Sequence, residues 1–184
     1  KKKKKKKKKK EKRKKENPKE KKKREDIAMR IYTDGACSNN GYEGSRAGYG
    51  FVVVDDNDEM LFTLSETVPD DFEQTNNIAE LLAIVETLWW LEDNCLPTEE
   101  IKIFSDSAYC INGINSWMDS WVKNGWKRAG NKSIKNLALW QAIYKFIKES
   151  GFKVEFIKVK GHADDHWNNM ADRLAVEGRM KHDR

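Results

Sequence analysis

Three consecutive segments in which apolar and polar residues alternate constrain the fold of this chain more than any other feature. They cover residues 28–34, 48–54 and 59–66, and the turn-forming run Asp55 to Asp58 separates the last two. A repeat of two residues is typical of half-buried β-strands. We therefore expect three strands that meander antiparallel and bury at least one face of a sheet.

The pattern then changes to helices that alternate with strands. We expect an apolar helix at about 75–92 and a strand at 100–105, followed by the remaining elements: helical material from 107 to about 123, a helix at about 134–149, a strand at 153–160 and a helix at about 166–180. Strands that first meander and then alternate with helices predict an α/β fold, with a mixed sheet that carries helices on its faces.

Positive charge is concentrated at the N-terminus. Residues 1–25 contain 19 Lys or Arg and 4 Glu, so they carry +15, and because the whole chain carries +6, residues 26–184 carry −9. A run of like charges without apolar residues cannot bury enough surface to offset its ordering entropy. We expect a disordered lysine-rich tail at 1–26, a folded domain at 27–180 and a short C-terminal end at 181–184. The tail could bind phosphates non-specifically, direct the protein to the nucleus, or only confer solubility.

Composition indicates the cellular compartment in which the chain functions. No apolar run approaches the roughly 20 residues that span a bilayer, so we expect no membrane association. The three cysteines, Cys37, Cys95 and Cys110, are widely spaced and form no C-x-x-C pair, which favours a reducing intracellular compartment, the nucleus or the cytoplasm. We expect a monomer. Because the chain begins at Lys1, a processed product and the C-terminal part of a longer protein both stay open.

Four carboxylates lie where a cation would explain them. Asp34 ends the strand-like run at 31–34, where Gly35 is expected to turn the chain. Asp106 follows the strand at 100–105, and Ser107 is placed to open the next helix. Carboxylates at the carboxyl ends of strands face the crevice in which open α/β sheets bind ligands. Glu80 shares a helical face with apolar residues, where an ionised carboxylate is costly unless it is paired or bound to a metal. Asp172 is the fourth candidate, and helix caps or surface charges are the alternative interpretation.

The chemistry of such a group favours a hard divalent cation. Four converging carboxylates would raise one another's pKa unless cations neutralised them. Ligand sets made only of oxygen favour Mg²⁺ or Mn²⁺ over zinc. The residues alone therefore make a metal-dependent nuclease the leading hypothesis.

Two further segments carry polar or aromatic candidates. The first interleaves tryptophans with cations, which suits stacking and phosphate pairing along a nucleic-acid strand; its members are Trp117, Trp121, Lys123, Trp126, Lys127, Arg128 and Lys132. A core-packing aromatic cluster is the alternative, because Trp117 and Trp121 lie four residues apart on a helix. In the second, His162 lies in a polar loop ten residues before Asp172, and Asn168 lies one helical turn before it. His162 is a catalytic candidate, although a lone loop histidine is more often an ordinary surface residue.

The ordered set of these motifs resembles the type 1 ribonuclease H family over residues 27–178. The matching pieces are Tyr32–Cys37 with Asn40-Gly41, Gln74–Asn77 with Ala79-Glu80, Ser105–Ser107 with Tyr109, the tryptophan-rich basic segment, and Lys160–His162 through Asn168 to Asp172. The resemblance implies a five-stranded mixed sheet flanked by helices. It also implies an endonuclease that hydrolyses the RNA strand of RNA/DNA hybrids and leaves 3′-hydroxyl and 5′-phosphate ends.

The same resemblance assigns roles to residues. The catalytic set would be Asp34, Glu80, Asp106, His162 and Asp172, and its four acids would hold two Mg²⁺ ions, which Mn²⁺ could replace. One ion would activate a water and the other would stabilise the departing 3′ oxygen. The hybrid would be bound by side chains that read the ribose 2′-hydroxyl (Cys37, Ser38, Asn39), the minor groove (Asn40, Asn76, Asn77) and a DNA-strand phosphate (Thr75, Asn136), with Asn168 and the tryptophan-rich basic segment.

Some positions depart from the family pattern or leave alternatives open. Glu73 replaces an arginine of some relatives and Ala129 lacks a hydroxyl found in others, so we expect a weaker grip on the DNA strand. The tail does not resemble the small hybrid-binding module of many eukaryotic members, so high processivity is not expected. Thr75 could be a helix N-cap, a phosphate contact or both. A ribonuclease H domain of a reverse transcriptase and a non-catalytic hybrid-binding module are the competing interpretations.

Overall fold

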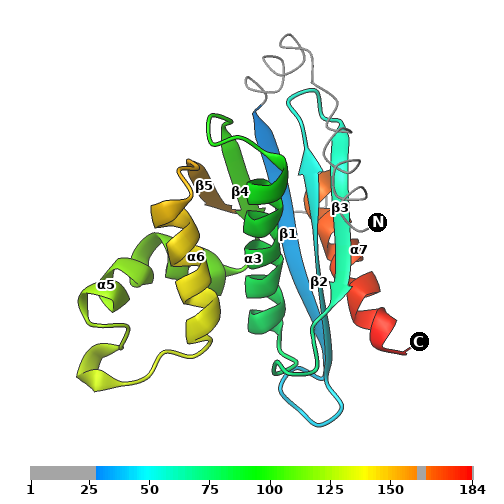
Figure 1. Ribbon diagram of the computed structural model, residues 1–184. Helices are drawn as coiled ribbons and strands as arrows, with labels where there is room; N and C mark the ends of the chain where they lie inside the picture. Colours follow the sequence, from blue (N-terminus) through cyan, green and yellow to red (C-terminus); the bar gives the residue numbers. More distant parts are fainter. Residues whose placement is uncertain (1–27, 161–164, 184) are drawn as a thin grey trace, which may run out of the picture.

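The computed structural model describes residues 28–160 and 165–183, which form a five-stranded mixed sheet with helices on both faces (Figure 1). The strand order is β3-β2-β1-β4-β5. Pairing is antiparallel from β3 to β1 and parallel from β1 to β5. The strands are β1 (Met29–Ser38), β2 (Arg46–Val54), β3 (Met60–Thr67), β4 (Ile101–Ser105) and β5 (Val154–Lys158). The predicted meander and the mixed sheet are both confirmed.

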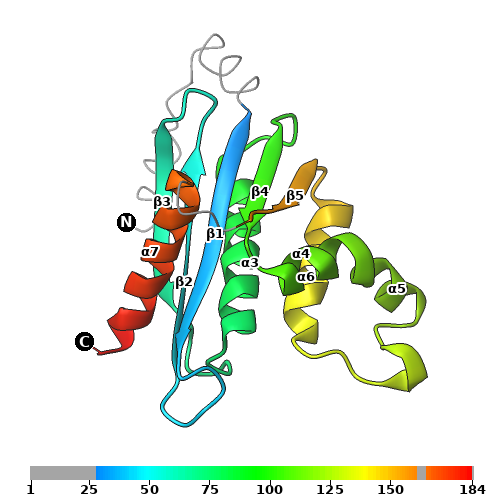
Figure 2. The same ribbon diagram turned by 180° about the vertical axis from the view of Figure 1, so that it is seen from behind.

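Helices cover the two faces of the sheet unequally. On one face lie α3 (Asn76–Asn94) and α6 (Leu137–Glu149), and on the other lies α7 (His166–Met180), as Figures 1 and 2 show from opposite sides. Between β4 and α6 the chain forms α4 (Ala108–Asn112), the π-helical turn η1 (Gly113–Trp117), α5 (Met118–Lys123) and the 3-10 turn η2 (Ala129–Asn131). A 3-10 turn, η3 (Lys181–Asp183), follows α7. Among the described residues, no helix is long and apolar enough to cross a membrane.

The core has one layer on each side of the sheet. Phe51 and Val53 of β2 belong to the larger layer, which includes most of α3, whereas Val52 and Val54 pack on the α7 side. Because both faces of β2 are covered, its sequence is apolar at nearly every position, and the alternation expected over residues 48–54 is wrong for this strand. Helix α3 begins where the Thr75 hydroxyl accepts a hydrogen bond from the Ile78 amide at 3.3 Å, so the predicted N-cap is confirmed.

The expected end of the first strand is wrong. Asp34 lies in the middle of β1, because the pairing with β2 continues to Ser38, opposite Arg46. The parallel partner β4 stops earlier, with Ser105 opposite Thr33. Gly35 makes no turn; a Cβ there would lie 2.5 Å from the amide nitrogen of Glu80, so glycine is needed for the close approach of α3 to β1.

The helical material predicted from 107 to 123 is interrupted by the π-helical turn. A Cβ at Gly113 would overlap the ring of Trp140, so the turn packs directly on the indole of α6. Ser107 opens α4 as expected, because its hydroxyl accepts from the Cys110 amide at 3.1 Å. The predicted tail at 1–26 lies outside the described residues.

Candidate active site

Three of the four predicted acids meet at the centre of the sheet. One carboxylate oxygen from each of Asp34, Glu80 and Asp106 lies within 4.8 Å of the others. Asp34 and Asp106 follow the paired residues Thr33 and Ser105 of two neighbouring parallel strands, so their side chains reach the same place. Glu80 comes from the beginning of α3, which Gly35 allows to lie close to β1.

Burial and mutual repulsion raise the pKa of all three carboxyl groups. Asp34 is 4% exposed, and burial, followed by the charge of Asp106, raises its pKa to about 7 although the Gly35 amide donates to it at 2.8 Å. Burial and then the charge of Asp34 hold the pKa of Glu80 well above its ordinary value. Burial and then the charge of Asp172 raise the pKa of Asp106. The ionised cluster is therefore costly without a positive partner.

Glu80 gives the most direct sign of what that partner is. Its Oε2 atom is buried and has no hydrogen-bond partner among the described residues. Three carboxylates that supply only oxygen atoms, one of them buried without a donor, fit a hard divalent cation. The residues present thus fit a divalent metal ion, the class of cofactor that the sequence predicted.

The other predicted catalytic residues are placed less tightly. Asp172 is exposed on α7 and is not part of the group within 4.8 Å. It is nevertheless near enough for its charge to raise the pKa of Asp34 and Asp106. His162 lies in residues 161–164, outside the described residues. Asn168, one turn before Asp172, is 6% exposed, so a direct contact with substrate would require its side chain to move.

The residues expected to read the RNA strand form two segments that touch. The first runs from Cys37 and Ser38 at the end of β1 through Asn39, whose φ is 52°, to Asn40. The second contains the residues at the start of α3, 75–77. The Asn40 Oδ1 atom accepts a hydrogen bond from the Asn76 amide at 2.9 Å, so the structure brings these predicted contacts together.

The tryptophan-rich segment combines core and surface roles. Trp117 is 38% exposed, whereas Trp121 is half-buried and meets the fully buried Trp140 edge-on at 5.2 Å between ring centroids. Trp117 and Trp121 lie beside a cavity of about 710 Å³, which Tyr109 and Trp140 also line. Trp126 is half-buried against Tyr144, with 5.4 Å between ring centroids. The core interpretation therefore holds in part for Trp121 and Trp126, while Trp117 presents the most open face.

Two cations, Arg128 and Lys135, line this cavity, and the other polar candidates of this region lie outside its lining. The four predicted cations are all exposed; they are Lys123, Lys127, Arg128 and Lys132. Asn136 adopts a left-handed conformation with φ 61°, and its Nδ2 atom donates to the Tyr109 hydroxyl at 3.1 Å. Sequence reasoning missed Lys135, which forms a 3.4 Å ion pair with Glu73. Its position next to Asn136 was the available signal.

Trp140 was also missed. Its Nε1 atom donates to the Tyr109 hydroxyl at 3.3 Å, and its ring packs on Tyr109 and Trp121. Asn136 precedes α6 and Trp140 lies in its first turn, so both side chains reach the same Tyr109 hydroxyl. The buried Trp140 ring therefore supports Tyr109 and Trp121, two of the aromatic side chains that line the cavity.

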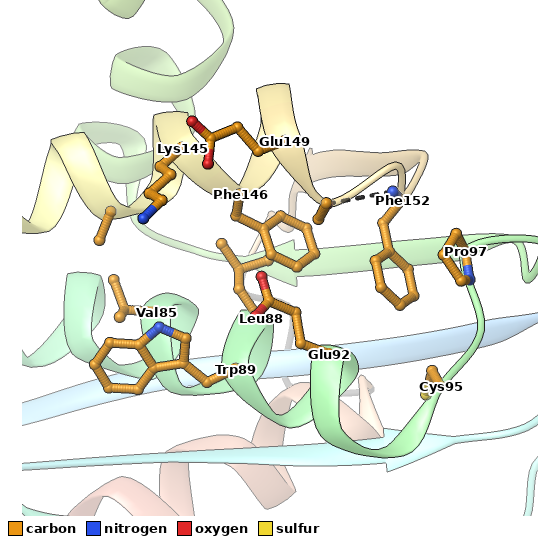
Figure 3. Close-up of a pocket in the computed structure, with 12 residues that line it drawn as sticks. Val85, Leu88, Trp89, Glu92, Cys95, Pro97, Lys145, Phe146, Glu149 and Phe152 are labelled. Atoms are coloured by element: carbon orange, nitrogen blue, oxygen red, sulfur yellow. Dashed lines mark hydrogen bonds between the residues drawn. The ribbon is translucent and has the colours of Figure 1, made fainter.

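A separate groove lies between α3 and α6 (Figure 3). It has a volume of about 550 Å³ and an apolar floor that includes Val85, Leu88 and Phe146. Trp89, 51% exposed, and Glu92 lie on its α3 side. None of the predicted site residues lines it.

Comparisons with known proteins all point to one family. The ribonuclease H family model matches residues 26–180. The chain is 43% identical over 150 residues to ribonuclease H of Clostridium botulinum, covering 80% of this chain and 92% of that protein. A solved type 1 ribonuclease H with the type 2 active-site motif superposes with a TM-score of 0.71 at 28% identity, covering 84% of this chain and 72% of that chain.

A second solved structure, a ribonuclease H1 in complex with an RNA/DNA hybrid, has a TM-score of 0.63 at 23% identity and supports the fold alone. It covers 85% of this chain and 99% of that chain. The matched residues 26–180 contain all three clustered carboxylates. By sequence and by fold, the chain belongs to the ribonuclease H family.

Proposed function

We infer that this protein is a metal-dependent endonuclease that hydrolyses the RNA strand of RNA/DNA hybrids, leaving 3′-hydroxyl and 5′-phosphate ends. The observation that carries the inference is the cluster of Asp34, Glu80 and Asp106, in which a buried Glu80 oxygen has no hydrogen-bond partner among the described residues. Family membership supplies the reaction class.

The cofactor that we propose is a pair of Mg²⁺ ions, which Mn²⁺ could replace. Asp34, Glu80 and Asp106 would hold them, with Asp172 at the rim of the site. The bound cations would supply a nucleophilic water and stabilise the departing 3′ oxygen. The carboxylates themselves would repel the scissile phosphate, so we expect hybrid binding near the site to depend on their neutralisation.

The two polar segments would distinguish RNA from DNA. Reading a ribose needs groups that meet the 2′-hydroxyl, which both donates and accepts. We assign this role to Cys37, Ser38 and Asn39 together with Glu80. Exposed amides would contact base edges in the minor groove without demanding a sequence; these are Asn40, Asn76 and Asn77.

The DNA strand would lie over the aromatic cavity and its cations. Thr75 can serve in two ways, because its hydroxyl oxygen accepts from Ile78 as a cap while its hydroxyl hydrogen can donate to a phosphate. Asn136 uses Nδ2 toward Tyr109, and that amide has a second hydrogen to offer. Trp117 would pack on the sugar or base, with Trp121, Trp126 and the four exposed cations around it; Asn168 remains a weaker candidate.

The loop histidine completes the proposal. We assign His162 to proton transfer near the departing group or to release of product. The His162→Ala variant should then slow turnover by about 100-fold or more if its role is chemical, and less if it only speeds release. Single-turnover and multiple-turnover rates distinguish the two roles, and unchanged values for both would leave His162 as an ordinary loop residue.

The same proposal includes the organisation of the chain: a lysine-rich tail at 1–26, a catalytic domain at 27–180 and an end at 181–184, acting inside the cell as a monomer. A non-catalytic hybrid-binding module is less consistent with the site. A binder has no use for a buried Glu80 beside Asp34, since both repel phosphate. The identity of 43% to a bacterial ribonuclease H favours a cellular enzyme over a reverse transcriptase domain.

Strand-labelled duplexes test the function directly. RNA/DNA, RNA/RNA and DNA/DNA duplexes of one sequence would be incubated with and without Mg²⁺. We expect cleavage of the RNA strand of the hybrid only, dependent on the cation, with 3′ ends that a polymerase can extend. Cleavage of DNA/DNA, or of the hybrid in the presence of a chelator, would contradict the proposal.

A further inference from the structure

Gln74 makes more side-chain hydrogen bonds than its place in a surface loop would suggest. It lies between β3 and α3, and its Oε1 atom accepts from the Ala47 amide at 2.9 Å. Its Nε2 atom donates to the carbonyl oxygens of Val68 at 3.3 Å, Pro69 at 3.2 Å and Phe72 at 3.2 Å. Only this orientation of the carboxamide faces oxygen to an N–H group and nitrogen to carbonyl groups.

The backbone of Gln74 continues the connection toward the predicted RNA-contacting residues. Its carbonyl oxygen accepts from the Cys37 thiol at 3.2 Å. The next residue, Thr75, caps α3, and the Asn76 amide donates to Asn40 at 2.9 Å. Gln74 therefore joins the start of β2, the loop at 68–73 and the two polar segments.

Apart from the Gln74 carboxamide, the loop is held mainly at its first residue, where Val68 is buried and its amide donates to the Ala47 carbonyl at 2.9 Å. Its acidic residues, Asp70, Asp71 and Glu73, are exposed, and Phe72 is half-buried against the core. The three carbonyl groups that Gln74 binds lie before and after the turn at residues 70–71, so losing its amide leaves them without that shared donor. Residues 69–73 would then be free to shift relative to β2.

The catalytic carboxylates do not depend on this loop in the same way. Asp34 and Asp106 are held by the pairing of β1 with β4, and Glu80 is held by the contact of α3 with Gly35. A shift of the loop would therefore disturb the polar segments before it disturbed the metal-binding cluster.

We propose that Gln74 is a positioning residue that holds residues 37–40 and 75–77 as one substrate-binding unit. It sets the affinity for the hybrid and leaves the chemical step unchanged. The proposal rests on the proposed function, because that function assigns these two segments to the RNA strand.

Steady-state kinetics of a variant of similar length test the idea. The Gln74→Met variant removes the donor and the acceptor, and we expect the KM for a hybrid to rise roughly tenfold, equivalent to about 1.4 kcal/mol, while kcat stays within about twofold. A change that only destabilises the fold would lower the active fraction, and thus the apparent kcat, without raising KM. Gln141→Met, on the exposed side of α6, is the matched control.

The Gln74→Glu variant adds a pH-dependent rescue. An ionised carboxylate keeps the acceptor for Ala47 but places negative charge against three carbonyl oxygens, whereas the protonated acid can donate to one of them. The KM of this variant, divided by that of the wild type at each pH, should approach one toward pH 5.5 and increase toward pH 8. For Gln74→Met the same ratio should stay constant.

The outcomes separate the two proposals. If the wild type cleaves the hybrid but the folded Gln74→Met variant has an unchanged KM, or if the ratio for Gln74→Glu does not vary with pH, the role of Gln74 is refuted. If the wild type does not cleave the hybrid at all, the proposed function itself fails.

Discussion

The Asp34→Asn substitution should stabilise the cation-free protein above neutral pH while abolishing cleavage. The folded protein raises the pKa of Asp34 from an ordinary 3.8 to about 7. Because its pKa is raised on folding, protonated Asp34 stabilises the folded state fully below about pH 3.8, and this stabilisation is lost as pH rises through about 7. Asparagine does not titrate, and its oxygen can still accept from the Gly35 amide.

The magnitude follows from the same interval. The difference between a pKa of 3.8 and one of about 7 corresponds to about 4 kcal/mol of folding free energy at pH 8. Removing this penalty in Asp34→Asn should raise the Tm of a chain of this size by roughly 10 °C. At pH 5 the stability of Asp34→Asn relative to the wild type should increase by less than half as much as at pH 8. In Mg²⁺ the variant should lose at least about 100-fold in cleavage rate, because a charged ligand is missing.

The assay is thermal unfolding in a chelator from pH 5 to pH 8, with hybrid cleavage measured in parallel. Asp71→Asn, at an exposed loop position, is the control for removal of one negative charge. The reasoning is refuted if the Tm difference between Asp34→Asn and wild type is the same at both ends of the pH range. Near-wild-type turnover of the variant at saturating Mg²⁺ would refute the assignment of the metal site.

Three other perturbations have expected outcomes. Gly35→Ala would place a Cβ 2.5 Å from the Glu80 amide nitrogen. We expect this to lower the free energy of unfolding by about 1–3 kcal/mol and the single-turnover rate by roughly 100-fold. An unaltered rate would show that α3 can move away from β1 without loss of activity. Glu73→Gln frees Lys135 for a DNA phosphate, so KM at low salt should fall a few-fold with little change in Tm, since exposed ion pairs contribute under about 1 kcal/mol; a KM that stays constant or rises would argue against a phosphate near Lys135. Deletion of residues 1–25 should give a shallower dependence of log affinity on log salt with nearly the same kcat, and equal slopes would mean that the tail does not touch nucleic acid.

Local periodicity predicted much of the fold because the face that each element buries is set by nearby residues. The helix at 166–180 is confirmed at both ends, and Thr75 and Ser107 cap helices where their spacing indicated. Gly35 misled the prediction because a glycine can serve either a turn or a close contact. The neighbour that requires this glycine, α3, begins about forty residues later, so the strand itself does not reveal the reason.

The acidic cluster was predictable from residue type, because a carboxylate among apolar residues is costly without a partner. The contacts of Gln74 and Trp140, which support the neighbouring substrate-binding segments, could not be predicted in this way. Gln74 bonds to the backbone of residue 47 and to three loop carbonyls, and any residue type could have provided those groups. Trp140 meets Trp121 only after α6 folds back and a π-helical turn alters the spacing before α5. Such contacts depend on distant backbone, which sequence patterns do not encode.

Because β1 continues beyond Asp34, the backbone around Asp34 and that around Asp106 should differ in local stability. Asp34 is followed by four more residues paired with β2, so exposing its backbone requires disruption of the sheet. Asp106, in contrast, follows the last paired residue of β4 and precedes a five-residue helix. Amide hydrogens around Asp34 should therefore exchange with solvent only on global unfolding, while those near Asp106 should exchange through small local openings. The site would then consist of a rigid half that defines its position and a mobile half that can adjust as substrate enters and product leaves.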